Sequence, residues 1–404
     1  MKVVQINCTY NVGSTGKITK DVHHFLLRNG VDSYVLYSDN KSSDKNTYKY
    51  MNKFERNLFS LHSHIIGNYG FEGVLAAKRV IKFLKKEKPD IVQIHNIHSH
   101  NGSLKCLFKF LNKTNIQICY SFHDCWPFTG YCPHFVSYSC SLWKKECNHC
   151  PAWKEYSFFF DKSRKNFNQK KTYLTNCKNL HLILASNWIK NTAQESFLKN
   201  KDMIVFPDGI DQNVFRVREN IHFKKIFPID KINILGVAYN FTIAKGILDF
   251  IKLANLVDEN VNIVLVGNID ESLKLPNNIT CIPKQDDQNL LSELFSNADI
   301  FMNLTKEESF GLTNIEALSC GTPVITYNSG GSPESIDDFC GSVIDEGDFE
   351  GLVNAIHKYG KKNSLIKSNC LKRSLLFSQE KMCENYLNFY KDLIKKRGED
   401  KYEK

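Results

Sequence analysis

The segment IFMNLTKEESFGLTNIEALSCGTPVIT, residues 300–326, contains two short apolar runs separated by a helix-like stretch. We predict strands at residues 300–304 and 323–326 and a helix at residues 313–319 between them. A strand, a helix and a second strand in this order form a βαβ unit with parallel strands. This segment therefore predicts an α/β fold around a parallel sheet.

The same alternation extends along the chain and occurs as two series. In the first series, predicted strands lie at residues 3–7, 33–37, 90–95, 116–121 and 182–185, with helices at 17–29 and 75–86. In the second series, further strands lie at 232–237, 261–266 and 279–282, with helices at 246–255 and 290–297. Two series of βαβ units predict two doubly wound, Rossmann-like domains.

The domain boundaries follow from the breaks in these series. We place the N-terminal domain at residues 1–205 and the C-terminal domain at 206–380, because Pro207 and Pro228 interrupt regular structure near the junction. Residues 381–404 contain a last predicted helix, which could pack back on the N-terminal domain or on the other one. Open parallel sheets bind ligands beyond the carboxyl ends of their strands, so the residues that follow strands are the candidate functional residues.

The composition is typical of a soluble globular enzyme, since 42% of the 404 residues are hydrophobic and 24% are charged. These values exclude a fibrous protein and wholesale disorder. The formal charge of +10 leaves nucleic acid, an anionic membrane face and phosphorylated substrates open as partners. The N-terminal residues lack the features of a signal peptide, and no run approaches the roughly 20 apolar residues of a membrane span. We therefore expect a cytoplasmic protein whose cysteines are mostly reduced.

A glycine-rich turn follows the first predicted strand. Gly13, Ser14 and Gly16 come after residues 3–7 and open a helix. Glycine permits a close backbone approach and a helix N-terminus favours an anion, so we expect this turn to face a diphosphate. The alternative is a tight turn that serves packing alone.

Two glutamates flank the start of the predicted helix at 313–319. Glu308 and Glu316 are separated by seven residues, and the free N–H groups at the helix start can hold a phosphate. Glu316, inside the helix, could accept hydrogen bonds from two ribose hydroxyls, and Glu308 could reach a sugar or a developing charge. The alternative is a capped helix with a solvated acidic turn.

The run from Glu308 to residue 325 resembles the Glu-x7-Glu signature of retaining glycosyltransferases of family 4, which have the GT-B fold. Further resemblances follow in the family's order along nearly the whole chain, at residues 13–16, 123–124, 186–188, 207–211, 245–246 and 330–334. The resemblance implies two Rossmann-like domains that face each other across a cleft. It also implies transfer of a sugar, with retention, from a UDP- or GDP-linked donor to a growing glycan, here a lipid-linked bacterial surface polysaccharide.

The resemblance implies roles for individual residues. The catalytic positions would be Glu308 beside the donor sugar, Lys245 at the diphosphate and His123 near the sugar from the N-terminal domain. The donor-binding positions would be Gly13, Ser14, Gly16, Asn240, Lys245, Ser309, Phe310, Gly311, Leu312, Thr313 and Glu316. In the implied front-face mechanism the leaving phosphate helps to deprotonate the acceptor, so neither a dedicated base nor a catalytic cofactor is needed. The family commonly has an arginine where this chain has Asn240, which cannot supply a charge.

Four of the fourteen cysteines, Cys132, Cys140, Cys147 and Cys150, are clustered within nineteen residues. Cys147 and Cys150 have the Cys-x2-Cys spacing that grips a metal with two thiolates, and the other two could complete a structural zinc site. Competing ligands are Cys125, His134 and His149. Buried free cysteines that behave as small apolar residues are the alternative. The stretch at about 125–151 resembles an insertion in a subset of family 4 enzymes of capsule and exopolysaccharide synthesis.

Three histidines, His95, His98 and His100, follow the predicted strand at 90–95. Because no acidic or cysteine partner lies nearby in sequence, we predict a loop that faces the cleft rather than a metal site. His95 alone could be a core residue.

Residues 153–171 combine aromatic residues with lysines, a combination that interfacial helices use at membrane surfaces. Docking on the inner face of the cytoplasmic membrane is one interpretation. An ordinary amphipathic helix packed on the N-terminal domain is the alternative, which we favour slightly.

Two other classes of function remain open. A nucleotide-sugar epimerase of the same fold would act on the donor alone, and the run from Glu308 to Glu316 disfavours it. A zinc-stabilised nucleic-acid-binding protein would gather basic residues on one face, whereas the lysines here are spread along the chain. We therefore expect no nucleic-acid partner. The donor base, the sugar, the acceptor and the oligomeric state are not determined by these patterns.

Overall fold

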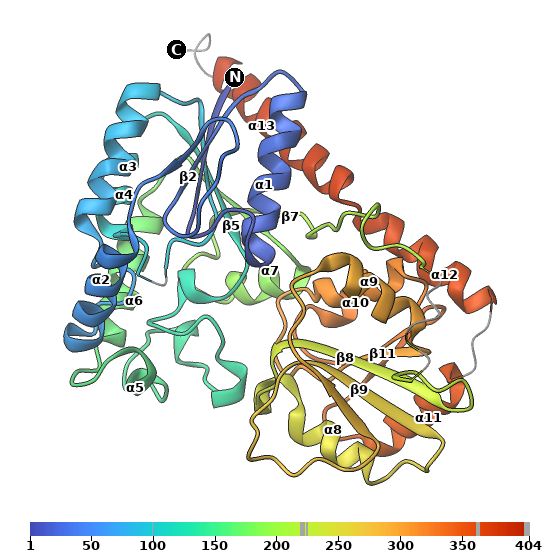
Figure 1. Cartoon of the computed structure of the whole chain (residues 1–404). Helices are drawn as coiled ribbons and strands as arrows, with labels where there is room; N and C mark the ends of the chain where they lie inside the picture. The colour runs from blue at the N-terminus through green and yellow to red at the C-terminus, as the bar shows by residue number, and fades with distance from the viewer. Residues whose placement is uncertain (99, 219–222, 224, 361–363, 400–404) are drawn as a thin grey trace. The chain divides into compact units, whose positions relative to one another are not determined.

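The computed structural model describes residues 1–404 except 99, 219–222, 224, 361–363 and 400–404. The chain divides into two compact units. Unit 1 contains Met1–Pro207 and Met382–Lys404, and unit 2 contains Asp208–Lys381. Each unit has a parallel sheet with helices packed around it (Figure 1).

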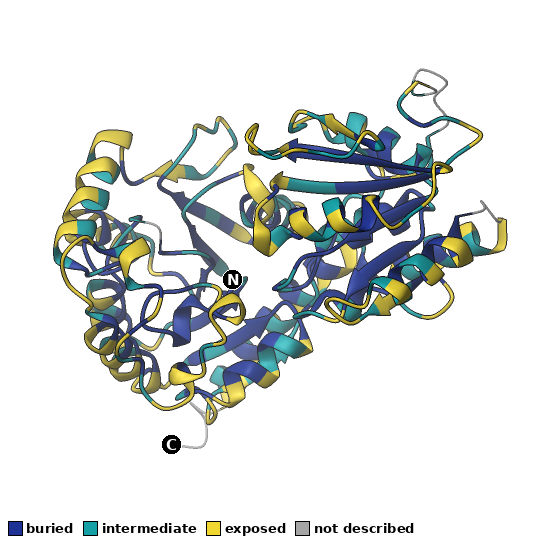
Figure 2. Ribbon diagram, turned by 90° about the horizontal axis from the view of Figure 1, so that it is seen from below, coloured by how far each residue is buried: buried dark blue, intermediate teal, exposed yellow. Residues whose placement is uncertain are grey.

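Among the described residues of unit 1, seven parallel strands form one sheet in the order β3-β2-β1-β4-β5-β6-β7. The strands are β1 (Lys2–Asn7), β2 (Asp32–Tyr37), β3 (Thr47–Lys49), β4 (Ile91–Ile94), β5 (Gln117–Phe122), β6 (Leu180–Leu184) and β7 (Asp202–Val205). In the register of the sheet, Val4 of β1 lies opposite Tyr34 of β2 and Val92 of β4. The central strands β1, β4 and β5 are largely buried, as expected for a parallel sheet covered on both faces, and Figure 2 shows buried strands inside each unit.

The helices of unit 1 cover both faces of its sheet. They are α1 (Gly13–Arg28), α2 (Lys53–Ile66), α3 (Val74–Glu87), α4 (Leu104–Leu111), α5 (Trp153–Tyr156), α6 (Ser163–Thr175), α7 (Asn187–Gln194) and α13 (Gln379–Glu399), with 3-10 turns η1 (Trp126–Phe128), η2 (Val136–Tyr138) and η3 (Leu142–Lys144). On one face, Ile18 of α1 and Tyr386 of α13 share a core with Ile91 of β4. Figure 1 shows α3 and α4 on the opposite face. The last helix therefore packs on unit 1, one of the two arrangements that the sequence left open.

Among the described residues of unit 2, six parallel strands form a sheet in the order β10-β9-β8-β11-β12-β13. The strands are β8 (Ile232–Asn240), β9 (Val261–Asn268), β10 (Ile279–Ile282), β11 (Ile300–Asn303), β12 (Val324–Tyr327) and β13 (Gly341–Ile344). The helices are α8 (Ile247–Ala254), α9 (Gln288–Asn297), α10 (Leu312–Ser319), α11 (Phe349–Tyr359) and α12 (Ser364–Ser374), with 3-10 turns η5 (Ile243–Lys245), η6 (Ser332–Ser335) and η7 (Leu375–Phe377). Ile234, Leu265, Ile325 and Leu352 belong to its core.

The strand order places the loops that matter for binding. It reverses between β1 and β4 in unit 1 and between β8 and β11 in unit 2. Ligands of open parallel sheets bind at the carboxyl ends of the strands beside such a reversal. In unit 1 these ends lead into α1 and residues 95–100, and in unit 2 they lead to Lys245 and Glu308.

The two-sheet α/β fold predicted from the sequence is confirmed, although the structure adds helices that were not predicted, among them α2, α4, α7, α11 and α12. Helix α1 begins at Gly13, four residues before the predicted start, so the glycine-rich turn forms the first turn of the helix. The strands β3, β7 and β13 were not predicted. Each lies at the edge of its sheet and is mostly half-buried or exposed, so its sequence gives a weaker apolar signal than that of a central strand.

Candidate active site

In unit 2, the loop after β8 carries Lys245 on the 3-10 turn η5. The Thr242 hydroxyl caps this turn and accepts a hydrogen bond from the backbone N–H of Lys245 at 3.3 Å. Gly246 follows with a φ of +78°, and a Cβ atom there would collide with the carbonyl oxygen of Leu304. The backbone N–H of Lys306 also donates to the Ala244 carbonyl at 2.9 Å. The loop is therefore held against the carboxyl end of β11.

This packing brings together Lys245 and Glu308, which are 63 residues apart in the sequence. The Nζ atom of Lys245 lies 3.0 Å from Oε2 of Glu308. The side chains are 38% and 24% exposed, so a ligand can reach both. An ion pair with this exposure contributes little to stability, typically about 0–1 kcal/mol. The pair therefore adds little to the stability of unit 2, and both charged groups remain accessible.

The backbone of Glu308 is fixed by the turn that follows β12. The N–H of Gly331 donates to the Glu308 carbonyl at 2.8 Å. Gly330 has a φ of +58°, and a Cβ atom there would overlap the same carbonyl oxygen. Only glycine allows this approach, which gives Gly330 of the 330–334 motif a physical reason.

A buried amide that we did not select from the sequence ties α10 to this turn. Asn314 Nδ2 donates to Ser332 Oγ and to Ser335 Oγ, each at 2.9 Å, and its Oδ1 accepts from Asn303 Nδ2 at 2.9 Å. The guanidinium of Arg373 on α12 then donates to the carbonyls of Glu334 at 2.7 Å and Ser335 at 3.2 Å. Asn314 and Arg373 act through partners that are distant in the sequence. The sequence therefore indicated only the turn itself, through the run Ser-Pro-Glu.

The N-terminus of α10 offers backbone N–H groups beside this loop. Gly311, with a φ of +88°, is the N-cap, and within the described residues no side chain caps it. The first-turn N–H groups of Leu312 and Thr313 therefore remain suited to an anion. Along α10, Thr313 and Glu316 are half-buried, whereas the four residues that follow Glu316 are buried. Thr313 and Glu316 are one turn apart and share a face of the helix.

The other predicted donor-binding residues of unit 2 differ in what they present. The N–H of Ser309 donates to Oε1 of Glu308 at 3.3 Å. The Phe310 ring is 3% exposed and packs on Phe377 with ring centroids 5.4 Å apart, so its side chain serves the core. Asn240, at the exposed end of β8, accepts a hydrogen bond from Asn268 Nδ2 at 2.9 Å.

In unit 1, His123 follows β5 and contacts His95, which follows β4. The rings stack with centroids 5.5 Å apart, and Nδ1 of His95 lies 3.2 Å from Nε2 of His123. On its other side, Nε2 of His95 lies 3.1 Å from Oε1 of Gln5. Burial, and then the neighbouring His123, hold the pKa of His95 well below its usual range. His95 is thus a neutral core residue that orients the half-buried His123.

The other two histidines of the 95–100 segment have acidic partners from distant parts of unit 1. Nε2 of His98 lies 3.3 Å from Asp124, and Nδ1 of His100 lies 2.9 Å from Glu72. Burial lowers the pKa of His98, and the opposing effect of Asp124 is smaller. Residue 99 of this segment lies outside the described residues. The sequence showed no such partners because they come from other loops.

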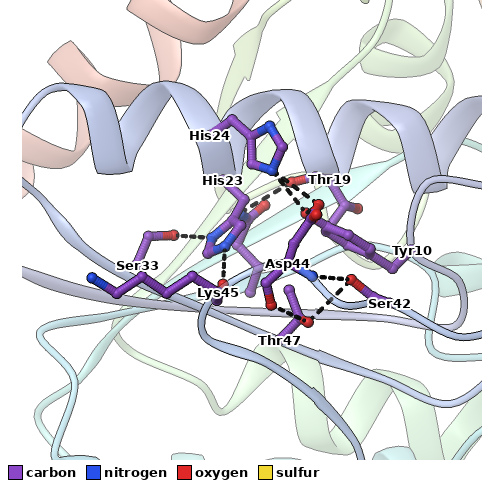
Figure 3. A network of polar contacts seen from close by, with 10 residues as sticks. Tyr10, Thr19, His23, His24, Ser33, Ser42, Asp44, Lys45 and Thr47 are labelled. Carbon is purple, nitrogen blue, oxygen red and sulfur yellow. Dashed lines mark hydrogen bonds and ion pairs between the residues drawn. The ribbon is translucent and has the colours of Figure 1, made fainter.

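The turn that leads from β1 into α1 is braced by the polar network shown in Figure 3. The Tyr10 hydroxyl donates to Oδ2 of Asp44 at 2.7 Å, and Nε2 of His24 lies 3.0 Å from the same oxygen. Nε2 of His23 lies 2.9 Å from the carbonyl of Lys45. The hydrogen bond from Tyr10 lowers the pKa of Asp44, which is therefore ionised at neutral pH. The network ties Tyr10 in this turn and the second half of α1 to the loop after β2.

The three residues of the glycine-rich turn differ in exposure. Gly13 and Ser14 are exposed, and no side chain of the described residues caps the helix at Val12. Gly16 is buried, and a Cβ atom there would lie 2.8 Å from Oγ1 of Thr9. Gly16 is thus needed for packing, while the amides at Gly13 and Ser14 are accessible to an anion.

The clustered cysteines lie in the loops between β5 and α6. Cys132, Cys147 and Cys150 are buried and Cys140 is half-buried. A hydrogen bond to Cys150, and then burial, raise the pKa of Cys132, and burial raises the pKa of Cys147 to about 12. Within the described residues, no three His, Cys, Asp or Glu side chains are grouped as a metal site. The zinc site predicted at these cysteines stays a prediction.

Helix α6, in the aromatic and lysine-rich stretch 153–171, packs inward. Phe167 and Lys170 are fully buried, and Nζ of Lys170 donates to the Trp126 carbonyl at 2.6 Å. The exposed apolar residues of the stretch are instead Phe158, Phe159 and Phe160, which precede the helix. Among the helices that the structure describes, none has the length and apolar character required to cross a bilayer.

Two known families match the chain, one in each half. Residues 16–214 match the family described as Glycosyltransferase Family 4, and residues 217–370 match the family described as Glycosyl transferases group 1. The boundary between the matches lies between residues 214 and 217. The first match therefore extends over most of unit 1, and the second over most of unit 2.

Several curated proteins are similar in sequence. N-acetyl-alpha-D-glucosaminyl L-malate synthase from Bacillus anthracis is 28% identical over 227 residues, which cover 52% of this chain and 59% of that protein. The putative colanic acid biosynthesis glycosyl transferase WcaC from Escherichia coli (strain K12) is 21% identical over 423 residues, which cover 97% and 100%. The Campylobacter jejuni N,N'-diacetylbacillosaminyl-diphospho-undecaprenol alpha-1,3-N-acetylgalactosaminyltransferase is 24% identical over 234 residues, which cover 51% and 60%. The chain thus spans about three fifths of the first and third of these proteins.

Solved structures share the fold. Sucrose-phosphate synthase from Thermosynechococcus elongatus superposes with a TM-score of 0.71 at 16% identity and covers 97% of this chain and 99% of that chain. Anabaena HepE, solved in complex with UDP-glucose, superposes with a TM-score of 0.65 at 14% identity and covers 97% and 100%. At these identities the likeness shows the fold alone.

Proposed function

The chain is a glycosyltransferase built from a family 4 domain and a group 1 domain, and we propose that it is a retaining enzyme that uses a nucleotide diphosphate sugar. The observation that carries this proposal is the contact between Lys245 and Glu308 at the strand reversal of unit 2. In the donor, an anionic diphosphate is joined directly to a neutral sugar. The ammonium of Lys245 suits the diphosphate, and the neighbouring carboxylate of Glu308 suits the hydroxyls of the sugar.

The proposed reaction needs stabilisation of the charge that develops on the leaving diphosphate as the bond to the sugar breaks. Positioned cations and backbone N–H groups supply such stabilisation without covalent chemistry. We assign this task to the ammonium of Lys245 and to the N–H groups at residues 309–313. Asn240 adds no charge, and its side-chain oxygen already accepts a hydrogen bond from Asn268. Lys245 is thus the main cationic side chain of the proposed site.

The two glutamates receive different tasks in this proposal. Glu308, whose backbone is fixed by Gly331 at 2.8 Å, orients the donor sugar through hydrogen bonds to its hydroxyls. Glu316 holds the ribose from the half-buried face of α10. His123 of unit 1 is assigned to the sugar by resemblance to the family. The leaving phosphate accepts the acceptor proton, so no side chain of the chain acts as a dedicated base.

The proposed acceptor is a growing lipid-linked glycan of a bacterial surface polysaccharide. Two similar proteins support this class, because their names specify colanic acid biosynthesis and a diphospho-undecaprenol acceptor. A lipid-linked acceptor requires the enzyme at a membrane surface, so we propose a cytoplasmic enzyme bound peripherally to the inner face of the membrane.

Nucleotide binding tests the donor assignment directly. In a saturation-transfer binding screen over UDP-, GDP- and other nucleotide sugars, we expect one nucleotide class to bind. Lys245→Ala should weaken that binding about 10- to 100-fold, since a hydrogen bond to a charged group contributes roughly 1.5–3 kcal/mol. Lys274→Ala, at an exposed lysine of the same unit, is the matched control and should bind like the wild type. Equal affinity of Lys245→Ala and Lys274→Ala would contradict the site.

The reaction type needs a separate test. Incubation of the donor without an acceptor should leave the sugar configuration unchanged, and conversion to an epimer would instead establish the epimerase alternative. With an acceptor, nuclear magnetic resonance of the product should show the anomeric configuration of the donor. An inverted product would refute the retaining mechanism while leaving the donor assignment intact.

A further inference from the structure

Helix α2 of unit 1 presents its apolar residues to solvent. Phe54, Leu58, Leu61 and Ile65 are 72%, 49%, 54% and 41% exposed. At 100° per residue these positions fall within about 60° of one another, so they form one stripe along the helix. Of the residues of α2, all of which the structure describes, only Ser63 is buried. A surface helix normally turns its apolar face to the core, whereas α2 has only the half-buried Phe59 and Ile66 on the side of Ser63 and leaves the larger apolar stripe outward.

Polar contacts explain how α2 is held with this face outward. Asn52 caps its N-terminus, and Glu55 completes the capping box. Glu55 then accepts a hydrogen bond from Arg79 of α3 at 3.0 Å, and Arg56 forms an ion pair with Asp39. The polar side of α2 is thus attached to unit 1. The apolar stripe is left without a role in the fold.

Three consecutive phenylalanines continue the stripe at the C-terminal end of α2. Phe158, Phe159 and Phe160 are 59%, 65% and 54% exposed. The N–H of Phe158 donates to the His64 carbonyl at 2.7 Å, and the two rings lie 5.1 Å apart between centroids. A Cβ atom on Gly67 would lie 2.7 Å from the Phe160 carbonyl, so this backbone also touches the end of the helix. The helix and the loop therefore form one apolar surface, which we call the α2–Phe158 surface.

Positive charge accompanies the α2–Phe158 surface. Lys53 is exposed at the start of α2, and Nζ of Lys162 lies 5.4 Å from the centroid of the Phe160 ring. Further exposed basic side chains follow on the same segment, namely Lys154, Lys165 and Lys171, whereas Arg164 pairs with Glu146 at 2.9 Å. The acidic residues of the segment 153–171 are Glu155 and Asp161, so its exposed and half-buried basic side chains outnumber its carboxylates.

We infer that the α2–Phe158 surface docks unit 1 onto an anionic lipid bilayer. Apolar and aromatic side chains on one helix face, beside lysines and arginines, match the acyl boundary and the negative headgroups of such a surface. The charge complementarity selects a bilayer over a second copy of this chain, which would place the same positive charges against each other. The inference rests on the proposed membrane location and specifies which residues produce it. Of the stretch 153–171 considered from the sequence, it uses residues 158–162 and not helix α6, which packs inward.

Vesicle flotation tests the surface with the full chain. We expect the wild type to float with vesicles of phosphatidylglycerol and phosphatidylethanolamine, and to float poorly with vesicles of phosphatidylcholine alone. The double variant Leu58→Ser and Phe159→Ser should lose about tenfold or more of the bound fraction, because it removes exposed apolar contacts. Phe339→Ser is the matched control, since Phe339 of unit 2 is 71% exposed and Phe159 is 65% exposed. Both changes are at the surface, so circular dichroism should show unchanged folds.

Each other outcome overturns part or all of the inference. Equal flotation of the double variant and the wild type would eliminate this surface. Equal binding to both vesicle types would eliminate the anionic lipid, and size-exclusion chromatography that shows a dimer dissolved by the double variant would assign the surface to a second copy. Nucleotide binding measured on the same samples separates the two proposals. A wild type that binds a nucleotide sugar but no vesicle would refute the docking alone.

Discussion

Asn314 offers a quantitative test of how unit 2 holds its candidate site. Replacing Asn314 with alanine removes three buried side-chain hydrogen bonds, to Asn303, Ser332 and Ser335. Ser332 keeps a contact with Thr326 Oγ1 at 2.6 Å, and Ser335 Oγ still donates to the Ser332 carbonyl at 2.6 Å. The main loss is therefore the partner of the Asn303 amide, together with a small cavity. A buried unsatisfied group and a cavity of this kind cost about 2–4 kcal/mol of unfolding free energy.

Urea unfolding can measure this loss within unit 2. With a slope of roughly 2 kcal/mol per molar urea, the midpoint of Asn314→Ala should fall by about 1–2 M. All four tryptophans lie in unit 1, so their fluorescence reports on unit 1 while circular dichroism also follows unit 2. We expect the dichroism transition to move and the fluorescence transition to move less. Asn277→Ala, at an exposed asparagine of unit 2, should leave the free energy of unfolding within about 0.5 kcal/mol of the wild type.

The same substitution has a functional consequence. Asn314 links α10 to the turn in which the N–H of Gly331 donates to the Glu308 carbonyl. Replacing Asn314 should therefore loosen both the start of α10 and the backbone of Glu308. We expect weaker nucleotide binding at urea concentrations where unit 2 is still folded. If the midpoint of Asn314→Ala equals that of Asn277→Ala, the buried amide network contributes no measurable stability and the reasoning is refuted.

Three further predictions concern single groups. Glu316→Ala should weaken nucleotide binding about tenfold or more relative to Glu271→Ala, an exposed control, and unchanged affinity would remove its ribose role. Metal analysis of protein purified without added zinc should find about one zinc per chain, lost in a Cys147→Ser variant; a content far below one would refute the four-thiolate site. Burial lowers the pKa of His98, so the folded protein holds this side chain neutral. Its contribution to the free energy of unfolding is complete above pH 6.5. That contribution is lost as the pH falls below this value, because the unfolded chain then binds a proton that the folded chain does not. The urea midpoint followed by fluorescence should therefore fall less steeply below pH 6.5 in His98→Gln than in the wild type, and parallel curves would contradict this.

Much of the candidate site could be predicted because it depends on local order along the chain. Lys245 and Glu308 each follow a strand of unit 2, and adjacent parallel strands end at the same edge of the sheet. Their position at one edge of the sheet was therefore implied once the parallel sheet was predicted, whereas the strand order that makes β8 and β11 neighbours came from the structure. The helix start after Gly311 was predicted for the same reason, since its signals are local.

Other residues could not be predicted because their roles come from distant partners. His98 and His100 had no acidic neighbour in the sequence, and the folded chain supplies Asp124 and Glu72. Arg373 supports residues 334 and 335 from a helix nearly forty positions later. A sequence pattern contains no information about such pairings, because they form only when separate loops pack together.

The sequence by itself determined the two parallel sheets, the order of their elements and the placement of chemically active residues after strands. These follow from apolar periodicity and turn signals, which act over a few residues. Only the tertiary structure decided which way α2 faces, that α6 packs inward and that Asn314 binds three side chains. Periodicity indicates that a helix has an apolar stripe, but packing against the rest of the chain decides whether that stripe meets the core or the solvent.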